Sequence, residues 1–286
     1  MSQGRYDLFH SFRGFRRAQM TNPPRVPKGI NPHVPNAARM YDYYLGGKDN
    51  FAADRAAAEK IMALGPSREI CLANRRFLGR AVRHVAGLGI DQFIDLGTGL
   101  PNQNNVHEVA REVHPGAHVV YVDYDPVVIV HARALLAGAD SSITIVHADI
   151  REPATVLDAP ETAALIDFSR PVGVVFLGVL HCLTDAEDPW GVVGAFRERM
   201  APGSALIASH LTDDAHPDVG KAAREVYDEA DAPLIHRGHE AVARLFEGFD
   251  VLEPGVTHVG DWRPDEAWET ELAGGEWWYV GVGRKP

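Results

Sequence analysis

Short apolar runs alternate with helix-like segments along most of this chain. The runs are expected to be strands at about residues 92–96, 118–122, 143–147, 172–180 and 204–209. Amphipathic segments lie between most of them, near residues 104–112, 126–137 and 189–200. Alternation of strand and helix is typical of an α/β fold with a doubly wound, mostly parallel sheet.

The runs differ in a way that indicates their places in the sheet. Residues 172–180 are almost wholly apolar, as expected of a central strand that is covered on both faces. Residues 143–147 alternate weakly between apolar and polar side chains, which favours a strand nearer the edge of the sheet. Further along, the pattern predicts helix over residues 217–247 and two late strands, at Phe249–Leu252 and Trp277–Val282.

The N-terminal part has a different character. Residues 22–35 contain five prolines, which exclude a helix and favour an extended path. Helices are predicted after them at 37–45, with Asn36 as N-cap, at about 50–64 and at about 67–85. The predicted organisation is therefore a disordered leader (1–29), a Pro-rich segment with a helical cap (30–88) and a main domain (89–286).

Composition narrows the classes of function. The chain has 286 residues and a net charge of −11, which disfavours general binding to nucleic acid, although the leader is basic. No apolar run reaches the roughly 20 residues that span a bilayer, and no signal-peptide core is present. The two cysteines, Cys71 and Cys182, are far apart and are expected to be reduced. We therefore expect a cytoplasmic protein without a membrane partner.

Three acids follow or end three of the predicted strands. They are Asp95, Asp123 and Asp149, and Asp95 opens the turn Asp95-Leu96-Gly97-Thr98-Gly99. Glycines let the backbone approach a ligand closely, and a carboxylate at the end of the second strand can accept both hydrogen bonds of a ribose diol. The pattern indicates a cofactor that contains a nucleoside. A dinucleotide is less favoured, because position 102 is Asn where that fingerprint has a third glycine.

The glycine turn resembles the first motif of class I S-adenosylmethionine-dependent methyltransferases. In that resemblance Asp123, followed by Tyr124, matches the ribose-binding acid, and Asp149 before Ile150 matches the acid that contacts the adenine amino group. Residues 200–204 resemble the proline-glycine turn before the fifth strand. Pro101 departs from the motif, which often has glycine there.

Two further segments make the resemblance more specific. The run Asn36–Phe51 and the segment Asp261-Trp262-Arg263-Pro264 are similar to a bacterial methyltransferase family whose substrate is unassigned. The similarity covers about residues 30–285. It implies a seven-stranded methyltransferase fold with an N-terminal helical cap, and it implies no particular acceptor.

Positions in the predicted fold indicate further contacts with the cofactor. Gly178 is placed where the backbone passes the methionine part, and one of Asn74, Arg75 and Arg76 is expected to reach the cofactor carboxylate, with Arg75 as our choice. The alternative for the arginines is a solvated helix face, which is favoured for at least one of them.

Methyl transfer from a sulfonium needs no enzyme nucleophile, only alignment, exclusion of water and sometimes a base. His181, after the central strand, is the leading candidate base; the alternative is a structural histidine at a strand end. Tyr44 on the first helix is expected in the acceptor pocket; packing of the cap is an equal alternative.

Two other clusters are interpreted as structural. His210, Asp213, Asp214 and His216 are residue types that bind metals, but their spacing fits no standard zinc motif, and an exposed loop is favoured. The tryptophans near the C-terminus, Trp262, Trp268, Trp277 and Trp278, favour core packing over an acceptor pocket. We expect no bound metal.

Together these features predict an S-adenosyl-L-methionine-dependent methyltransferase that acts on a small-molecule acceptor and releases S-adenosyl-L-homocysteine. Two alternatives remain open at this point. One is a non-catalytic protein that senses or sequesters S-adenosylmethionine. The other, less favoured, is an NAD(P)-dependent oxidoreductase.

Overall fold

The computed structural model describes residues 30–101, 104–136, 141–271 and 273–286. The predicted leader (1–29) and Asn102 lie outside these ranges. The strands are β1 (Gln92–Leu96), β2 (His118–Asp123), β3 (Ile143–His147), β4 (Gly173–Leu177), β5 (Ala205–Leu211), β6 (Asp250–Val251), β7 (Thr257–His258) and β8 (Trp278–Arg284). They form one sheet in the order β3-β2-β1-β4-β5-β8-β6, with β7 also paired to β8.

The sheet is a doubly wound α/β sheet, as the alternation predicted. Strands β1 to β5 pair in parallel, and β8 runs antiparallel to β5, β6 and β7. The run at 143–147 is an edge strand and the apolar run at 172–180 supplies the central β4, both as expected. The predicted seven strands form the continuous path, and the two-residue β7 is an addition that the sequence did not indicate.

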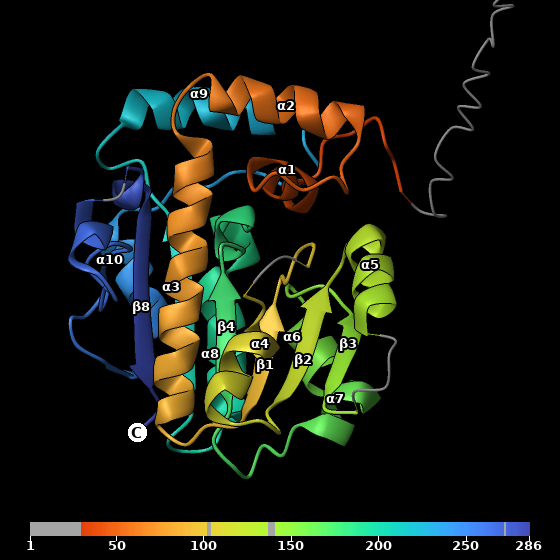
Figure 1. Cartoon of the computed structure of the whole chain (residues 1–286), viewed down its shortest axis with the longest axis vertical. Coiled ribbons are helices and arrows are strands. Elements are labelled where there is room, and N and C mark those ends of the chain that lie inside the picture. Colours follow the sequence, from red (N-terminus) through yellow and green to blue (C-terminus); the bar gives the residue numbers. More distant parts are fainter. Residues whose placement is uncertain (1–29, 102–103, 137–140, 272) are drawn as a thin grey trace, which may run out of the picture.

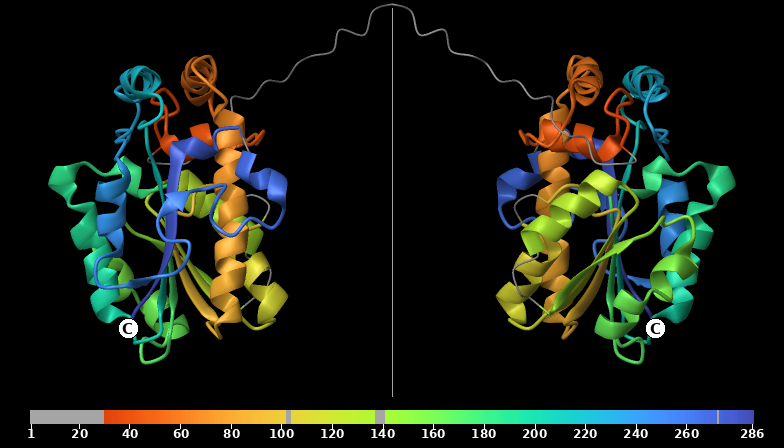
Figure 2. Two further views of the ribbon diagram at one scale, coloured as in Figure 1. Left: turned by 90° about the vertical axis from the view of Figure 1, so that its left-hand side faces the viewer. Right: turned by 90° about the vertical axis from the view of Figure 1, so that its right-hand side faces the viewer.

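Helices cover both faces of this sheet (Figure 2). One face carries α3 (Ser67–Gly87), α4 (Val106–Val113) and α5 (Pro126–Leu136), whose apolar residues join one core cluster. The other carries α6 (Pro153–Leu157), α7 (Pro160–Leu165), α8 (Pro189–Arg199) and α10 (His239–Ala243), which pack into a second cluster. The described residues also include five short 3-10 helices: η1 (Leu180–Cys182), η2 (Asp185–Glu187), η3 (Arg244–Phe246), η4 (Ala267–Glu271) and η5 (Gly275–Trp277).

A third layer lies across the carboxyl ends of the parallel strands. It contains α1 (Ala37–Tyr44), α2 (Ala52–Met62) and α9 (Pro217–Tyr227), which Figure 1 shows above the strand tips. The side chain of Asn36 accepts a hydrogen bond from the Arg39 amide at 2.9 Å, so it caps α1 as predicted. We call α1, α2 and α9 the cap from here on.

The prediction of helix over residues 217–247 is wrong in its middle. Helix α9 ends at Tyr227, and residues 228–238 form a loop before α10. The loop is held by long-range contacts: the Asp231 amide donates to the carbonyl of Pro35 at 2.9 Å, and the Ile235 amide donates to that of His181 at 2.8 Å. Pro233 also lacks the amide that a continuous helix needs. None of these partners is visible in local sequence.

Within the described residues, none of the helices has the length and apolar character needed to cross a membrane.

Candidate functional site

A single cavity lies between the carboxyl edge of the sheet and the cap. The loops after β1, β2, β3 and β4 line one side of it. The cap, the start of α3, the loop 228–238 and the start of β8 line the other. In open parallel sheets, ligands bind at this edge, at the point where two neighbouring strands lead into helices on opposite faces of the sheet. In this sheet that point lies between β1 and β4.

The glycine turn after β1 adopts a backbone conformation that favours glycine. Gly97 and Gly99 have φ values of +69° and +64°, which L side chains rarely adopt. A Cβ at Gly97 would lie 2.3 Å from Cγ2 of Val179, so the turn is also pressed against the loop after β4. The amides of Gly97 and Thr98 both donate to the Val122 carbonyl, at 2.9 and 3.1 Å, which fixes the turn to β2.

Asp95 and Asp123 face the cavity from neighbouring strands, and both are buried. Asp95 accepts a hydrogen bond from the Thr98 hydroxyl at 3.0 Å. Asp123 accepts from the amides of Gly99 and Asp125, each at 2.9 Å. Burial raises the pKa of each carboxyl from 3.8 to about 6, more than these hydrogen bonds lower it.

Asp149 and Ile150 lie at the same edge, after β3, and line the cavity. Asp149 is bound by Arg151: Nε lies 3.0 and 2.9 Å from its two carboxylate oxygens, and Nη2 lies 2.6 Å from Oδ2. Arg151 also donates to Glu187 at 2.8 Å. Burial raises the pKa of Asp149, but the Arg151 hydrogen bonds and charge outweigh it and lower the pKa below its ordinary value. Asp149 is therefore an ionised acceptor with a fixed orientation.

Gly178 directly follows β4, has φ +62° and lines the cavity. Its amide donates to the Ser209 hydroxyl at 2.8 Å. A Cβ there would lie 3.0 Å from Nδ2 of Asn74 and 3.2 Å from the Trp278 ring. A side chain here would be strained by the positive φ and would crowd these neighbours, and the role of Gly178 beside the methionine part stays a prediction.

His181 lies on η1, lines the cavity and is 8% exposed. Its Nδ1 is buried without a hydrogen-bond partner among the described residues. Burial, then the neighbouring His210, His236 and Arg237, lowers the pKa of His181 well below 6.5. The ring is therefore neutral near pH 7 and keeps one nitrogen unused by the fold.

Behind His181 lies a more fully bonded histidine. One ring nitrogen of His210 lies 2.7 Å from the Leu211 carbonyl, and the other lies 2.8 Å from Nη1 of Arg237. Arg237 also donates to the carbonyls of Leu180 and Leu183 and to Asp185. Arg237 thus holds the segment that carries His181.

The remaining predicted residues are distributed as follows. Arg75 lines the cavity and donates to the Asn104 carbonyl at 2.9 Å, whereas Arg76 is exposed over the ring of Trp268. Tyr124 lines the cavity, and its hydroxyl donates to Asp231 at 2.9 Å. Tyr44 is buried, lines the cavity and faces Tyr227; burial, then Tyr227, raises its pKa well above 10.0.

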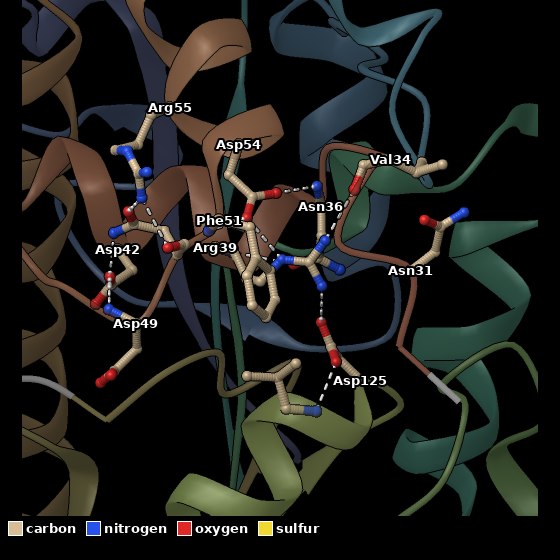
Figure 3. A network of polar contacts seen from close by, with 12 residues as sticks. Asn31, Val34, Asn36, Arg39, Asp42, Asp49, Phe51, Asp54, Arg55 and Asp125 are labelled. Atoms are coloured by element: carbon tan, nitrogen blue, oxygen red, sulfur yellow. Dashed lines mark hydrogen bonds and ion pairs between the residues drawn. The ribbon is translucent and has the colours of Figure 1, made fainter. Parts of the chain in front are cut away.

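The cap is fastened to the sheet by a buried polar cluster, which Figure 3 shows. Nε of Arg39 donates to Asp54 at 2.9 Å, and its Nη1 lies 3.5 Å from Asp125 in the turn after β2. Asp54 also accepts from the amides of Asn36 and Phe51, at 2.9 and 2.7 Å. Because Asp125 donates its amide to Asp123, this cluster connects the cap directly to the sheet edge.

Asp231 makes the second connection between the cap and the rest of the chain. It accepts hydrogen bonds from the side chain of Asn36 at 2.6 Å and the amide of Ala37 at 3.2 Å. Sequence reasoning missed Asp231, because its partners are remote in the chain. It also missed the Arg39–Asp54 pair, for which charged residues on the inner faces of two short helices were an available signal.

The segment 261–264, which carried part of the resemblance, has a packing role. Trp262 is fully buried and meets Phe77 edge to face at 5.3 Å. Arg80 of α3 donates to the Trp262 carbonyl at 3.0 Å and pairs with buried Glu269 at 3.0 Å. Trp277 and Trp278 pack in the core, as favoured, and also line the cavity, whereas Trp268 is 51% exposed and the prediction of core packing is wrong there.

The four residues weighed as a metal site point to different partners. His210 is bonded to Arg237, Asp213 to Arg224, Asp214 to Tyr279, and His216 stacks on Trp277. Over the parts of the chain that the structure describes, no three His, Cys, Asp or Glu side chains are grouped to hold a metal.

Comparison with known proteins agrees with this geometry. A candidate methyltransferase from Thermobifida fusca is 43% identical, with a TM-score of 0.84 over 92% of this chain and 99% of its own. A DUF574 family protein from Streptomyces avermitilis is 36% identical, with a TM-score of 0.84 over 88% of this chain and 98% of its own. A search of curated proteins gave no match. The family model described as S-adenosyl methyltransferase matches residues 24–286, and the chain therefore belongs to the S-adenosyl methyltransferase family.

Proposed function

We propose that this protein transfers a methyl group from S-adenosylmethionine, the cofactor of its family, to a small-molecule acceptor held beneath the cap. The observation that carries the proposal is the single cavity, which joins the predicted cofactor residues to a second set of side chains from the cap. A site covered by the cap, which is formed by segments of residues 30–88 together with α9, favours a small acceptor over a macromolecule. The family match gives no support to the nicotinamide alternative.

The residues at the sheet edge suit the cofactor. Asp123, at the end of β2, would accept the ribose hydroxyls, and Asp149 with Ile150 would bind the adenine. Gly97, Gly99 and Gly178 present bare backbone to the cavity, and Thr98 lines it between the first two. We assign Asp95 and Arg75 to the amino-acid part, since both line the cavity beside this turn.

When bound, S-adenosylmethionine supplies a methyl group on a sulfonium, so the chain needs no covalent nucleophile. Its residues must align the acceptor and exclude water. We assign to His181 the role of base: its neutral ring lines the cavity and can take the proton that an oxygen or nitrogen acceptor loses. Tyr44, on the cap, is assigned to the acceptor pocket.

Calorimetry tests the cofactor assignment. S-adenosylmethionine and S-adenosylhomocysteine should bind and NAD should not. Asp123→Ala should weaken cofactor binding by about 1.5–3 kcal/mol, through lost charge-assisted hydrogen bonds. Asp158→Ala is the matched control, because Asp158 is exposed and outside the cavity. Binding of NAD without either sulfur ligand would refute the proposal.

Turnover tests the base and the sensor alternative together. The full chain is incubated with methyl-labelled donor and fractionated metabolites to find an acceptor that gains label. His181→Ala should then lower transfer at least ~100-fold while cofactor affinity stays within about twofold. Exposed His239 provides the control variant His239→Ala. Equal loss of both properties would make His181 structural, and tight cofactor binding with no labelled product would favour the sensor.

A further inference from the structure

The cap side of the cavity has a different chemical character from the sheet side. Its apolar lining comes from α2, α3, α9, the loop 228–238 and β5, and its aromatic lining comes from α1, α9 and the start of β8. The apolar residues include Ile61, Leu64, Ile70, Leu211, Val219 and Leu234. The aromatic residues are Tyr41, Tyr44, Tyr227, Trp277 and Trp278. We call this set the acceptor wall.

The charged groups that line the cavity lie elsewhere or are already engaged. In the described chain they are Arg75, Asp95, Asp123, Asp125, Asp149, Arg151 and Asp231. Five of these are on the sheet side: Asp95 in β1, Asp123 at the end of β2, and Asp125, Asp149 and Arg151 in the turns after β2 and β3. Asp231 is held by Asn36, Ala37 and Tyr124, and Arg75 contacts the Asn104 carbonyl. The acceptor wall itself contributes no Lys, Arg, Asp or Glu.

Apart from Asp231, the titratable side chains that line the cavity beside the acceptor wall have pKa values shifted toward their neutral forms. Burial lowers the pKa of His236 to about 4, and the Arg224–Asp213 pair sits behind that ring. The hydroxyls of Tyr44 and Tyr227 and the thiols of Cys71 and Cys182 all have pKa values raised by burial. An anionic ligand placed there would lose hydration and gain no counter-ion, which is costly. A cationic ligand would meet only Asp231, whose oxygens already accept three hydrogen bonds.

Resting on the proposed function, we infer that the acceptor is an uncharged, largely apolar molecule that offers one hydroxyl or N–H group toward His181. Nδ1 of His181 and the hydroxyl of Tyr44 are buried polar atoms at this cavity that have no hydrogen-bond partner among the described residues. An apolar body gains from burial against the acceptor wall, at about 25 cal/mol per Å² removed from water, and aromatic rings add favourable edge and stacking contacts. Acidic, cationic and phosphorylated acceptors are disfavoured.

Three probes of matched shape test this inference: 2-naphthol, 6-hydroxy-2-naphthoate and 6-(aminomethyl)-2-naphthol. Each is titrated by calorimetry at pH 7.5 into the full chain, both free and saturated with S-adenosylhomocysteine. The neutral naphthol should bind at least ~10-fold more tightly than either charged probe. Equal or tighter binding of a charged probe, or no binding of naphthol up to about 1 mM, would overturn the inference.

A charge introduced into the acceptor wall provides the complementary test. Val219, on α9, is partly exposed and lines the cavity, so a lysine there can reach a ligand without full burial. Val219→Lys should tighten binding of 6-hydroxy-2-naphthoate about tenfold relative to Val219→Met, and should not tighten the cationic probe. Indistinguishable probe affinities in the two variants would contradict the inference. If the wild-type protein did not bind S-adenosylhomocysteine, the proposed function would be refuted. The relative affinities of the three probes for the free protein would still test the inference about the acceptor.

Discussion

The two sides of the cavity are built by different kinds of contact. On the sheet side, Thr98 bonds to Asp95 three residues away, and the Gly99 amide bonds to Asp123 on the next strand. On the cap side, Asn36 bonds to Asp231 across 195 residues. The chemistry differs as well: carboxylates line the sheet side, and apolar and aromatic groups line the cap side. The side proposed to hold the cofactor is thus polar and built by contacts close in the chain or between neighbouring strands, whereas the side proposed to hold the acceptor is assembled from distant segments.

The largest expected effect is on the attachment of the cap. Asp54→Asn leaves the buried Arg39 guanidinium without its main partner and places amide hydrogens against two backbone donors. We expect a loss of about 3–5 kcal/mol in the free energy of unfolding, measured in urea. Lys60→Met, which removes the exposed pair with Glu229, should change stability little. A small loss for Asp54→Asn would show that the cap does not depend on this pair.

A smaller effect separates steric contact from backbone strain on the sheet side. Gly97→Ala places a Cβ 2.3 Å from Val179 at a positive φ, whereas Gly99→Ala has a similar φ but meets only Ala38, at 4.0 Å. We expect losses of about 2–4 kcal/mol for Gly97→Ala and about 1 kcal/mol for Gly99→Ala in thermal or urea unfolding. Equal losses of stability would mean that the loop after β4 moves aside to accommodate the added methyl group. The sheet side would then deform more easily than its contacts indicate.

The smallest expected effect is a dependence of S-adenosylhomocysteine binding on pH, which arises from carboxyl groups on the sheet side. Burial raises the pKa of Asp123 to about 6, and ribose hydroxyls would donate to its ionised form. S-adenosylhomocysteine should therefore bind about tenfold more weakly at pH 5 than at pH 7, measured by calorimetry. Asp123→Asn should reduce this difference, with Asp95 accounting for what remains. A flat profile in the wild type would show that the ionisation of Asp123 is not linked to binding.

The raised pKa of Asp123 has the opposite consequence for the stability of the ligand-free protein. The folded-state pKa of Asp123 lies above its ordinary value of 3.8, so the folded state binds the proton more tightly than the unfolded state does. The stabilisation from that proton is present below about pH 4 and is lost as pH rises through about 6. Asp123→Asn should therefore flatten the pH dependence of the ligand-free protein's stability in that window, although its amide group replaces one of the two oxygens that accept backbone hydrogen bonds.

Much of the fold could be predicted because strands and helices leave local periodic patterns. The runs at 92–96 and 143–147 match β1 and β3 residue for residue, and β4 is shorter than its apolar run by a few residues. The prediction of helix failed over residues 228–238, where the amides of Asp231 and Ile235 donate hydrogen bonds to carbonyls far away in sequence. Polar residues within short helices, such as Arg39 and Asp54, carried a signal of burial, but not the identity of their partners.

By itself the sequence determined the α/β class, the glycine turn and the acids at the strand ends, because each depends on neighbouring residues and on the period of a strand. The resemblance that it carried led to the family. Only the tertiary structure decided which side chains meet across the cavity: Tyr44 faces Tyr227, His181 keeps an unpaired nitrogen, and Trp277 and Trp278 belong to both core and cavity. These relations arise because the cap folds back over the sheet edge, and contacts between segments that are nearly 200 residues apart leave no periodic mark in the chain.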